Sequence, residues 1–239
     1  MKVSDIREQF KKLKADEKYV IDKTGCKLLE IVGATFDADE DTIFGDVNRD
    51  YVAREIAWYE SMSRNVNDIP GGPPVVWARC ATKEGLINSN YGYLIWSEEN
   101  GKQYDHVLNE LKNHPDSRRA VMIYTRPSIW DEYNKDGMSD FICTNTVQYL
   151  VRDDKLVAVV QMRSNDAWAG YRNDFAWQQH VQKRLADDLG LPVGKIIWSV
   201  SSLHLYERNF YLVDAFTETG RHDFTLKEWQ NRNVAKLHH

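Results

Sequence analysis

The sequence lacks the cysteine pairs that zinc sites and disulfide frameworks require. Its three cysteines, Cys26, Cys80 and Cys143, form no C-x-x-C pair and no cysteine–histidine cluster, so we expect reduced thiols and no bound metal. No apolar run approaches the length of a membrane span, and the charged segment 1–14 has no signal-type apolar core. These absences indicate a cytoplasmic protein that does not bind membranes.

Basic charge and nucleotide-binding glycine motifs are also scarce. The net charge of −5 argues against a general nucleic-acid coat protein, although a local arginine cluster is enough to bind a small anion. The sequence has no G-x-x-x-x-G-K and no G-x-G-x-x-G, which argues against nucleoside triphosphatases and dinucleotide enzymes. It also lacks G-x-S-x-G and H-E-x-x-H, which removes two large hydrolase classes.

The composition favours one large domain over residues 1–239, because 42% of the residues are hydrophobic and 12% aromatic. The final residues, 237–239, resemble the start of a purification tag. The apolar periodicity predicts helices at 4–14 (N-cap Ser4), 50–63, 103–111, 173–189 and 207–216, and strands at 27–36 (broken at Gly33), 120–124, 145–152, 156–162 and 195–203. The strands at 145–152 and 156–162 are predicted to form a hairpin that turns at Asp153-Asp154. Interspersed strands and helices favour an α/β (mixed α+β) fold with a large mixed sheet flanked by helices.

Cys143 is the candidate for covalent chemistry. A lone cysteine is usually a small buried apolar residue, but this sequence also supplies Arg118-Arg119 and Arg163-Ser164. A nearby guanidinium favours the reactive thiolate form of a cysteine. Paired arginines also suit a phosphate, because each guanidinium presents a planar fork of donors. The residues alone leave both interpretations open.

Several motifs resemble those of a known family in both sequence and order. These are D-K-T-G (22–25), N-Y-G (90–92), P-D-S-R-R (115–119), S-D-F-I-C-T-N-T around Cys143 (139–146), M-R-S-N-D (162–166) and H-L-Y (204–206). In this order they resemble thymidylate synthases. The segments 123–128, 133–141 and 143–150 are more similar still to phage deoxycytidylate hydroxymethylases. The resemblance covers roughly residues 19–212 and implies a thymidylate synthase-like fold.

The resemblance implies a nucleophile and a phosphate site. Cys143 matches the family nucleophile, which adds to C6 of a pyrimidine ring. Arg163 and Ser164 match phosphate ligands. Arg118 and Arg119 match arginines that reach the phosphate of the other subunit, so the resemblance implies a homodimer whose interface completes the active site.

It also implies the groups that hold the sugar and move protons. Lys23 stands where synthases usually carry an arginine, and a lysine offers a point charge without the fork. His204 and Tyr206 match contacts to the sugar 3′ hydroxyl, and on a strand they face the same side. Glu55 matches the glutamate that organises water and proton transfer. Tyr91 matches the tyrosine that assists removal of the C5 proton.

The implied one-carbon donor is 5,10-methylenetetrahydrofolate, with Trp77 on the folate side and Asp166 as the carboxylate that binds the pterin. Asp174 stands where synthases carry the asparagine that reads uracil. A carboxyl accepts from the cytosine amino group and, when it shares a proton, donates to N3, so Asp174 favours a cytosine nucleotide. A register shift by one residue would place Asn173 at the position of the synthase asparagine, and the site would then recognise uracil.

The fate of the one-carbon adduct separates the activities that remain open. Hydroxymethylases add water, whereas synthases add hydride. The water route rests on the overall resemblance and on replacements such as Thr144, where synthases carry a histidine. The leading expectation is therefore a deoxycytidylate hydroxymethylase acting in the (host) cytoplasm. The alternatives are a cytidylate hydroxymethylase, a dCMP or dUMP methyltransferase, and a nucleotide- or RNA-binding protein that has lost catalysis.

Overall fold

The computed structural model describes residues 1–236, so the purification-tag interpretation of residues 237–239 lies outside the described residues. The chain divides into two compact units. Unit 1 contains Met1–Val47, Ser164–Ala176 and the chain from Trp198 onward, and unit 2 contains Asn48–Arg163 and Trp177–Ile197. The expected single domain stays a prediction.

One six-stranded sheet, in the order β1-β2-β6-β5-β4-β3, runs through the fold. Its strands are β1 Val20–Ile21, β2 Lys27–Asp37, β3 Val121–Ile123, β4 Thr144–Arg152, β5 Lys155–Asp166 and β6 Val193–Tyr206. The pairs β1/β2, β3/β4 and β4/β5 are antiparallel. In contrast, β5 and β6 run in the same direction, because Leu156 bonds to Pro192 where both strands begin and Ala167 bonds to His204 where both end. The sheet is therefore mixed, and the predicted fold class is confirmed.

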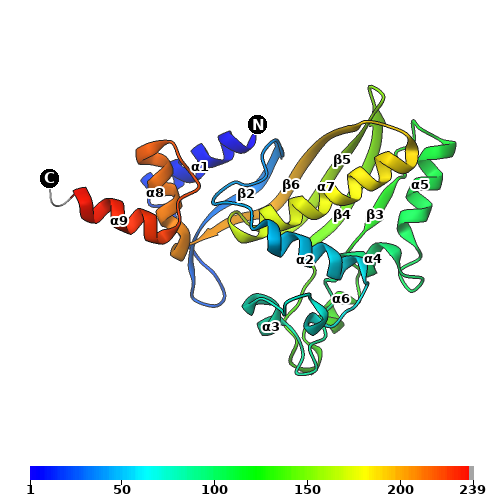
Figure 1. Ribbon diagram of the computed structural model, residues 1–239, viewed down its shortest axis with the longest axis horizontal. Coiled ribbons are helices and arrows are strands. Elements are labelled where there is room, and N and C mark those ends of the chain that lie inside the picture. The colour runs from blue at the N-terminus through cyan, green and yellow to red at the C-terminus, as the bar shows by residue number, and fades with distance from the viewer. Residues whose placement is uncertain (237–239) are drawn as a thin grey trace. The chain divides into compact units, whose positions relative to one another are not determined.

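Unit 2 is built on the β4–β5 hairpin, which has the predicted two-residue turn. Asp153 and Asp154 have φ angles of 50° and 55°, the left-handed pair that a type I′ turn requires. Its helices are α2 Arg49–Glu60, α3 Val75–Cys80, α4 Tyr91–Trp96, α5 Gln103–Asn113 and α6 Ile129–Glu132. Helix α7 Ala169–Leu189 passes through both units. Its C-terminal part lies across β4 and β5 (Figure 1), where the Gln182 side chain donates to the Leu156 carbonyl over 2.7 Å.

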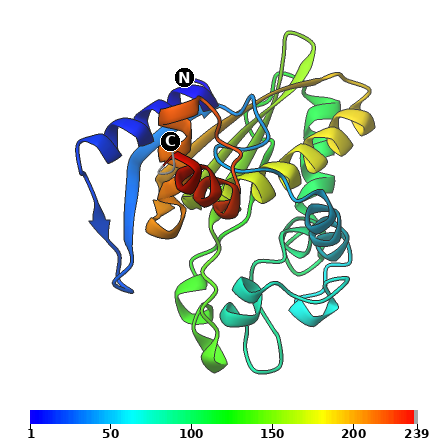
Figure 2. The ribbon, with the colours of Figure 1, turned by 60° about the vertical axis from the view of Figure 1, so that its left-hand side comes forward.

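Unit 1 places helix α1, Val3–Ala15, against β2. Its other helices are α8 Phe210–Thr219 and α9 Leu226–Lys236. Helix α1 buries Val3, Ile6 and Phe10 completely, which are the i, i+3 and i+7 positions of one helix face. Helices α1 and α8 lie beside each other (Figure 2). Among residues 1–236, no helix is both long and apolar enough to cross a membrane.

The predicted elements are present, with corrections at their ends. Ser4 is not an N-cap, since α1 begins at Val3 and the Asp5 carboxylate accepts from the Lys2 amide at 2.8 Å. Gly33 does not break its strand, because β2 continues through it with a φ of 70° that glycine adopts without strain. Helix α7 begins four residues earlier than predicted, at Ala169. A 3-10 turn at Glu207–Asn209 precedes α8, which begins at Phe210.

Candidate active site

Cys143 lies directly before β4, beside an arginine on the neighbouring strand. Its Sγ is 3.4 Å from Nη2 of Arg163. The antiparallel ladder brings these residues together, since the Arg163 amide donates to the Cys143 carbonyl over 2.9 Å. The guanidinium is fixed by further bonds to the carbonyls of Ile142 (3.0 Å) and Phe141 (2.5 Å). A half-buried sulfur next to a fixed positive charge is suited to nucleophilic attack.

Glu55 on α2 lies in a buried cluster of hydrogen bonds within unit 2. Its Oε1 accepts from the Tyr51 hydroxyl at 2.6 Å and from the Trp77 indole at 2.9 Å. The same indole is 3.0 Å from the Tyr51 oxygen. Burial raises the pKa of Glu55, and the two hydrogen bonds oppose this shift. Such a carboxyl keeps its proton to a higher pH than an exposed glutamate does.

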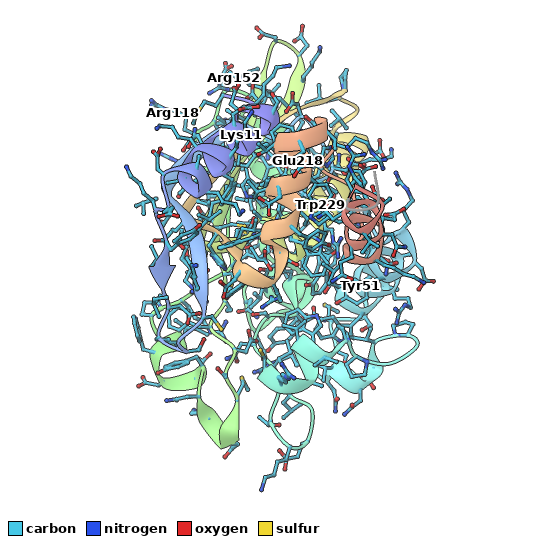
Figure 3. The ribbon with its side chains drawn as sticks, turned by 90° about the vertical axis from the view of Figure 1, so that its left-hand side faces the viewer. Lys11, Tyr51, Arg118, Arg152, Glu218 and Trp229 are labelled. Atoms are coloured by element: carbon cyan, nitrogen blue, oxygen red, sulfur yellow. The ribbon has the colours of Figure 1, made fainter. Side chains whose placement is uncertain are left out.

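Tyr51 is a member of this cluster that the sequence analysis missed. It precedes Glu55 by one helical turn, so its hydroxyl reaches the carboxylate from the same helix face. The residue is labelled on α2 in Figure 3. The i, i+4 spacing is a signal that could have identified it. Trp77 was expected only as a folate-side aromatic, and the structure shows that its indole also orients Glu55.

Tyr91 is the first residue of α4 and is 4% exposed. Its ring stacks on Tyr59 with centroids 5.3 Å apart and meets the edge of Tyr124 at 5.2 Å. Asn90 caps the helix by accepting from the Tyr93 amide at 2.7 Å. Gly92 is required here, because a Cβ at this position would lie 1.9 Å from the Tyr59 carbonyl oxygen. The N-Y-G motif therefore fixes Tyr91 against α2.

In unit 1, the end of β6 brings His204 and Tyr206 to the same side, as predicted. Their rings lie 5.1 Å apart. Asp166, at the end of β5, accepts from the Trp168 amide at 2.9 Å. Burial raises the pKa of Asp166, while the Trp168 amide and the charges of His204 and Arg208 oppose the shift. Asp166, His204 and Tyr206 thus bring a carboxyl, an imidazole and a phenol to the ends of two adjacent strands.

Asp174 on α7 is held by an amide that the sequence analysis did not single out. Asn165 donates to Oδ2 of Asp174 over 2.7 Å and accepts from the Trp198 indole at 3.3 Å. Asn165 is only 3% exposed. A Cβ at Gly170 would lie 3.0 Å from the Asn165 amide nitrogen, so a larger residue there would press on this pair. The neighbouring Asn173 has a buried Oδ1 for which the described residues supply no hydrogen bond.

Three of the remaining phosphate candidates lie on the surface. Lys23 is exposed in a tight turn, in which the Asp22 carboxylate accepts from the amides of Thr24 (2.8 Å) and Cys26 (2.9 Å). Arg118 and Arg119 are both exposed, and Arg118 is labelled in Figure 3. Ser164 follows Arg163 on β5 and is half-buried. Within unit 2, the structure therefore pairs Cys143 with Arg163 and leaves the Arg118 and Arg119 side chains facing solvent.

The thymidylate synthase family profile matches residues 9–237, which include every candidate residue above. The chain belongs to the thymidylate synthase family. Among family relatives, the deoxycytidylate 5-hydroxymethyltransferase of Enterobacteria phage T4 is 52% identical over 236 residues, and that of phage T6 is 53% identical over 237 residues. Each match covers 96% of this chain and 96% of the relative. The resemblance expected from the motifs is confirmed.

A solved family structure confirms the fold. Thermostable thymidylate synthase A from Bacillus subtilis matches with a TM-score of 0.68, covering 91% of this chain and 84% of that chain at 23% identity. The thymidylate synthase of Bacillus subtilis subsp. natto is 28% identical over 189 residues, which is 76% of this chain and 65% of that protein. The match to the phage enzymes is thus both higher in identity and more complete than the match to this synthase.

Proposed function

We propose that this family member is a deoxycytidylate 5-hydroxymethyltransferase. In the proposed reaction, dCMP, 5,10-methylenetetrahydrofolate and water give 5-hydroxymethyl-dCMP and tetrahydrofolate. The observation that carries the proposal is identity of 52% and 53%, over 96% of the chain, to two phage enzymes that bear this name. The carboxyl side chain at position 174 supports cytosine as the base.

Asp174 is the proposed base-reading residue. Cytosine presents an amino donor at C4 and an acceptor at N3. A protonated carboxyl matches this edge when its hydroxyl oxygen donates to N3 and its carbonyl oxygen accepts from the amino group. Asn165 donates to Oδ2, which favours Oδ2 as the carbonyl oxygen and Oδ1 as the oxygen that carries the proton. A carbonyl oxygen has two lone pairs, so Oδ2 has room for both Asn165 and the cytosine amine.

Cys143 is the proposed nucleophile. Its sulfur forms a bond to C6, and the electron pair of the C5–C6 double bond moves into the ring toward C5 and N3. The Arg163 guanidinium 3.4 Å from the sulfur supports the anionic form that attacks. A proton shared from Asp174 to N3 helps the ring to accept these electrons. C5 is then electron-rich and able to form a bond to carbon.

Tyr91 and Glu55 are the proposed proton-transfer groups. The Tyr91 phenol assists removal of the C5 proton after the new carbon–carbon bond has formed. As this proton is lost, tetrahydrofolate would be released from the transferred carbon. Glu55 holds the water that then adds to this carbon and supplies the hydroxyl of the product. The Cys143 sulfur finally leaves C6, and the C5–C6 double bond re-forms. The raised pKa of Glu55 supports its role, since a buried carboxyl that is held by two donors and shifted toward the protonated form can serve as a general acid or base.

The residues present fit the proposed folate. A pterin ring presents N–H donors, and Asp166 offers a half-buried carboxyl whose Oδ1 already accepts from a backbone amide. Trp77 offers a half-buried indole face, which suits an aromatic ring. When bound, 5,10-methylenetetrahydrofolate supplies the carbon that C5 takes up. Asp166 and Trp77 would hold it through polar contacts and stacking, respectively.

We also propose a cytoplasmic homodimer in which Arg118 and Arg119 bind the nucleotide phosphate of the partner subunit. Their exposure supports this assignment, because an arginine that binds outside its own subunit must extend from the surface. Lys23, Arg163 and Ser164 are the proposed phosphate ligands from the same chain. His204 and Tyr206 are the proposed contacts to the sugar.

Product mass tests the proposal directly. Purified protein is incubated with CMP, dCMP and dUMP together and with methylenetetrahydrofolate, and each nucleotide is analysed by mass spectrometry. We expect dCMP to gain CH2O while the other two stay unchanged. A gain of CH2 would establish a methyltransferase, and a gain of CH2O on CMP would establish a ribonucleotide enzyme. Three unchanged nucleotides would contradict the assignment as an enzyme of this class.

A further inference from the structure

A buried carboxylate outside the proposed reaction scheme links two catalytic segments of unit 2. Asp140 is 7% exposed and lies three residues before Cys143. Its Oδ2 accepts from the amides of Asn88 and Ser89 at 2.7 and 2.8 Å, and its Oδ1 accepts from the Ser89 hydroxyl at 2.7 Å. The Asp140 carbonyl also accepts from the Asn88 side chain at 3.1 Å. Four hydrogen bonds therefore join positions 51 and 52 residues apart in the chain.

One side of this link leads to Tyr91. Asn88 and Ser89 directly precede the Asn90 cap and the first turn of α4, and all three are buried. The Asn90 amide also donates to the carbonyls of Trp58 (3.0 Å) and Ser63 (2.8 Å). The side chains of Asn88, Ser89 and Asn90 are thus all hydrogen-bonded, and Asp140 accepts from the backbone amides of Asn88 and Ser89.

The other side leads to Cys143. The two residues between Asp140 and Cys143 contribute the carbonyls that hold the Arg163 guanidinium. The Arg163 guanidinium also lies over the Phe141 ring, 4.8 Å from its centroid. The charge of Arg163 attracts the Asp140 carboxylate and opposes the rise that burial causes in the Asp140 pKa. The position of the sulfur and that of its guanidinium therefore both depend on a segment anchored at Asp140.

We propose that Asp140 is a positioning residue that sets where Cys143 lies relative to Tyr91. The inference rests on the proposed function for the roles of the sulfur and the phenol. The side chain of Asp140 is hydrogen-bonded to Asn88 and Ser89. It acts by holding the Asn88–Ser89 amides and the Phe141–Ile142 backbone at a fixed separation. A carboxylate suits this task, because its two oxygens accept three hydrogen bonds at once and an amide of the same size replaces one acceptor by a donor.

Asp140→Asn tests the proposal through the separation of kcat from KM. We expect kcat for dCMP hydroxymethylation to fall about 10- to 100-fold, because small displacements of reacting groups are costly, while KM for dCMP changes less than about twofold. Ser89→Ala, which removes only the hydroxyl donor, is expected to show a smaller fall in kcat. Val107→Ala, a buried change on α5, is the control for lost thermal stability. An Asp140→Asn protein with a lowered melting temperature and an unchanged kcat would overturn the proposal, as would a rise in KM with kcat retained.

Hydrogen exchange tests the mechanical link without requiring activity. In the full-length protein, we expect Ser89→Ala and Asp140→Asn to increase amide exchange in the peptide that contains Phe141–Thr144, and Val107→Ala to leave that peptide unchanged. Faster exchange confined to Asn88–Tyr91 would overturn the link. If the wild-type protein produces no 5-hydroxymethyl-dCMP but exchange rises at Phe141–Thr144, the proposed function fails and the link stands.

Discussion

The candidate for base recognition in unit 1, Asp174, and the candidates for covalent and proton chemistry in unit 2, Cys143 and Glu55, have different electrostatic surroundings. In unit 2, Cys143 lies beside a full positive charge on Arg163, and Glu55 is buried with a raised pKa. In unit 1, Asp174 is held by the neutral amide of Asn165. A charge changes reactivity strongly, whereas a neutral amide orients a carboxyl and fixes which of its oxygens accepts. We therefore expect changes in unit 2 to lower the rate of chemistry and changes in unit 1 to alter the choice of base.

The largest effect is expected at the nucleophile. Cys143→Ser replaces the sulfur by a hydroxyl that is not ionised at neutral pH, so kcat should fall by about 10⁴- to 10⁶-fold. The dissociation constant for dCMP, measured by calorimetry, should stay near that of the wild type, because the phosphate and base contacts remain. The substitution Cys26→Ser, at an exposed cysteine, is the matched control. Turnover by the Cys143→Ser protein would refute the assignment of the nucleophile.

A second large effect is expected at Glu55, where activity and stability should change in opposite directions. Glu55→Gln keeps an acceptor for the Tyr51 hydroxyl and the Trp77 indole but cannot exchange a proton. The expected loss in kcat is about 10²- to 10⁴-fold, the usual contribution of a general acid or base. Steady-state kinetics on dCMP measures it. An active Glu55→Gln protein would exclude proton transfer at this residue.

The pH dependence of the free energy of unfolding tests whether Glu55 has a raised pKa in the folded protein. Because the pKa of Glu55 is raised from its ordinary 4.5 in the folded state, the unfolded chain loses this proton first as pH rises. Ionisation therefore destabilises the fold above pH 4.5, and the free energy of unfolding falls until pH reaches the raised folded value. The Glu55→Gln protein has no ionisable group at this position, so its free energy of unfolding does not fall for this reason. Its melting temperature relative to the wild type should increase with pH over this range, and a constant difference would contradict a buried, ionisable Glu55.

A more moderate effect, on selectivity, is expected at Asp174. Asp174→Asn turns a carboxyl into an amide that matches the uracil edge, so turnover of dCMP should fall and that of dUMP should rise. The ratio of the two kcat/KM values should change by about 10- to 100-fold, since one bidentate base contact contributes roughly 1–3 kcal/mol. Competition assays with both nucleotides measure this ratio. An unchanged preference would place base reading elsewhere, and Asn173→Ala then tests the neighbouring register.

The sequence predicted most of the long elements and, apart from β3, none of the short helices and strands. Helices α1, α2, α5 and α7 and both hairpin strands have a full apolar period, which burial on one face enforces. Helices α3 and α4 have six residues each, which is too few to show a period. Helix α9 buries Trp229 but is otherwise mainly polar. Its position depends on contacts with α8 that no local pattern records.

In the candidate site too, the sequence did not reveal residues whose importance depends on contacts distant in the chain. The family resemblance predicted roles for Cys143, Glu55 and Asp174, because each lies in a segment similar to the family. Asp140 and Asn165 lie within quoted motifs but were not singled out, since their importance comes from partners elsewhere. Ser89 is 51 residues from Asp140, and Trp198 is 33 residues from Asn165. Hydrogen bonds over such distances in the chain are set by the fold and leave no periodic signal in the sequence.

The smallest effect, expected at Asn165, separates orientation of Asp174 from its mere presence. Asn165→Leu removes the donor to Oδ2 while filling a similar volume, so Asp174 keeps its carboxyl but loses the contact that assigns its two oxygens. We expect kcat/KM for dCMP to fall about three- to tenfold, in line with one hydrogen bond of roughly 1 kcal/mol, with no gain for dUMP. Trp198→Phe is the matched control, because it removes the indole bond to Asn165 together with some buried ring volume and leaves the Asn165–Asp174 bond in place. If Trp198→Phe lowered kcat/KM as much as Asn165→Leu, the loss would come from the packing around Trp198, and Asn165 would have no separate part in reading the base.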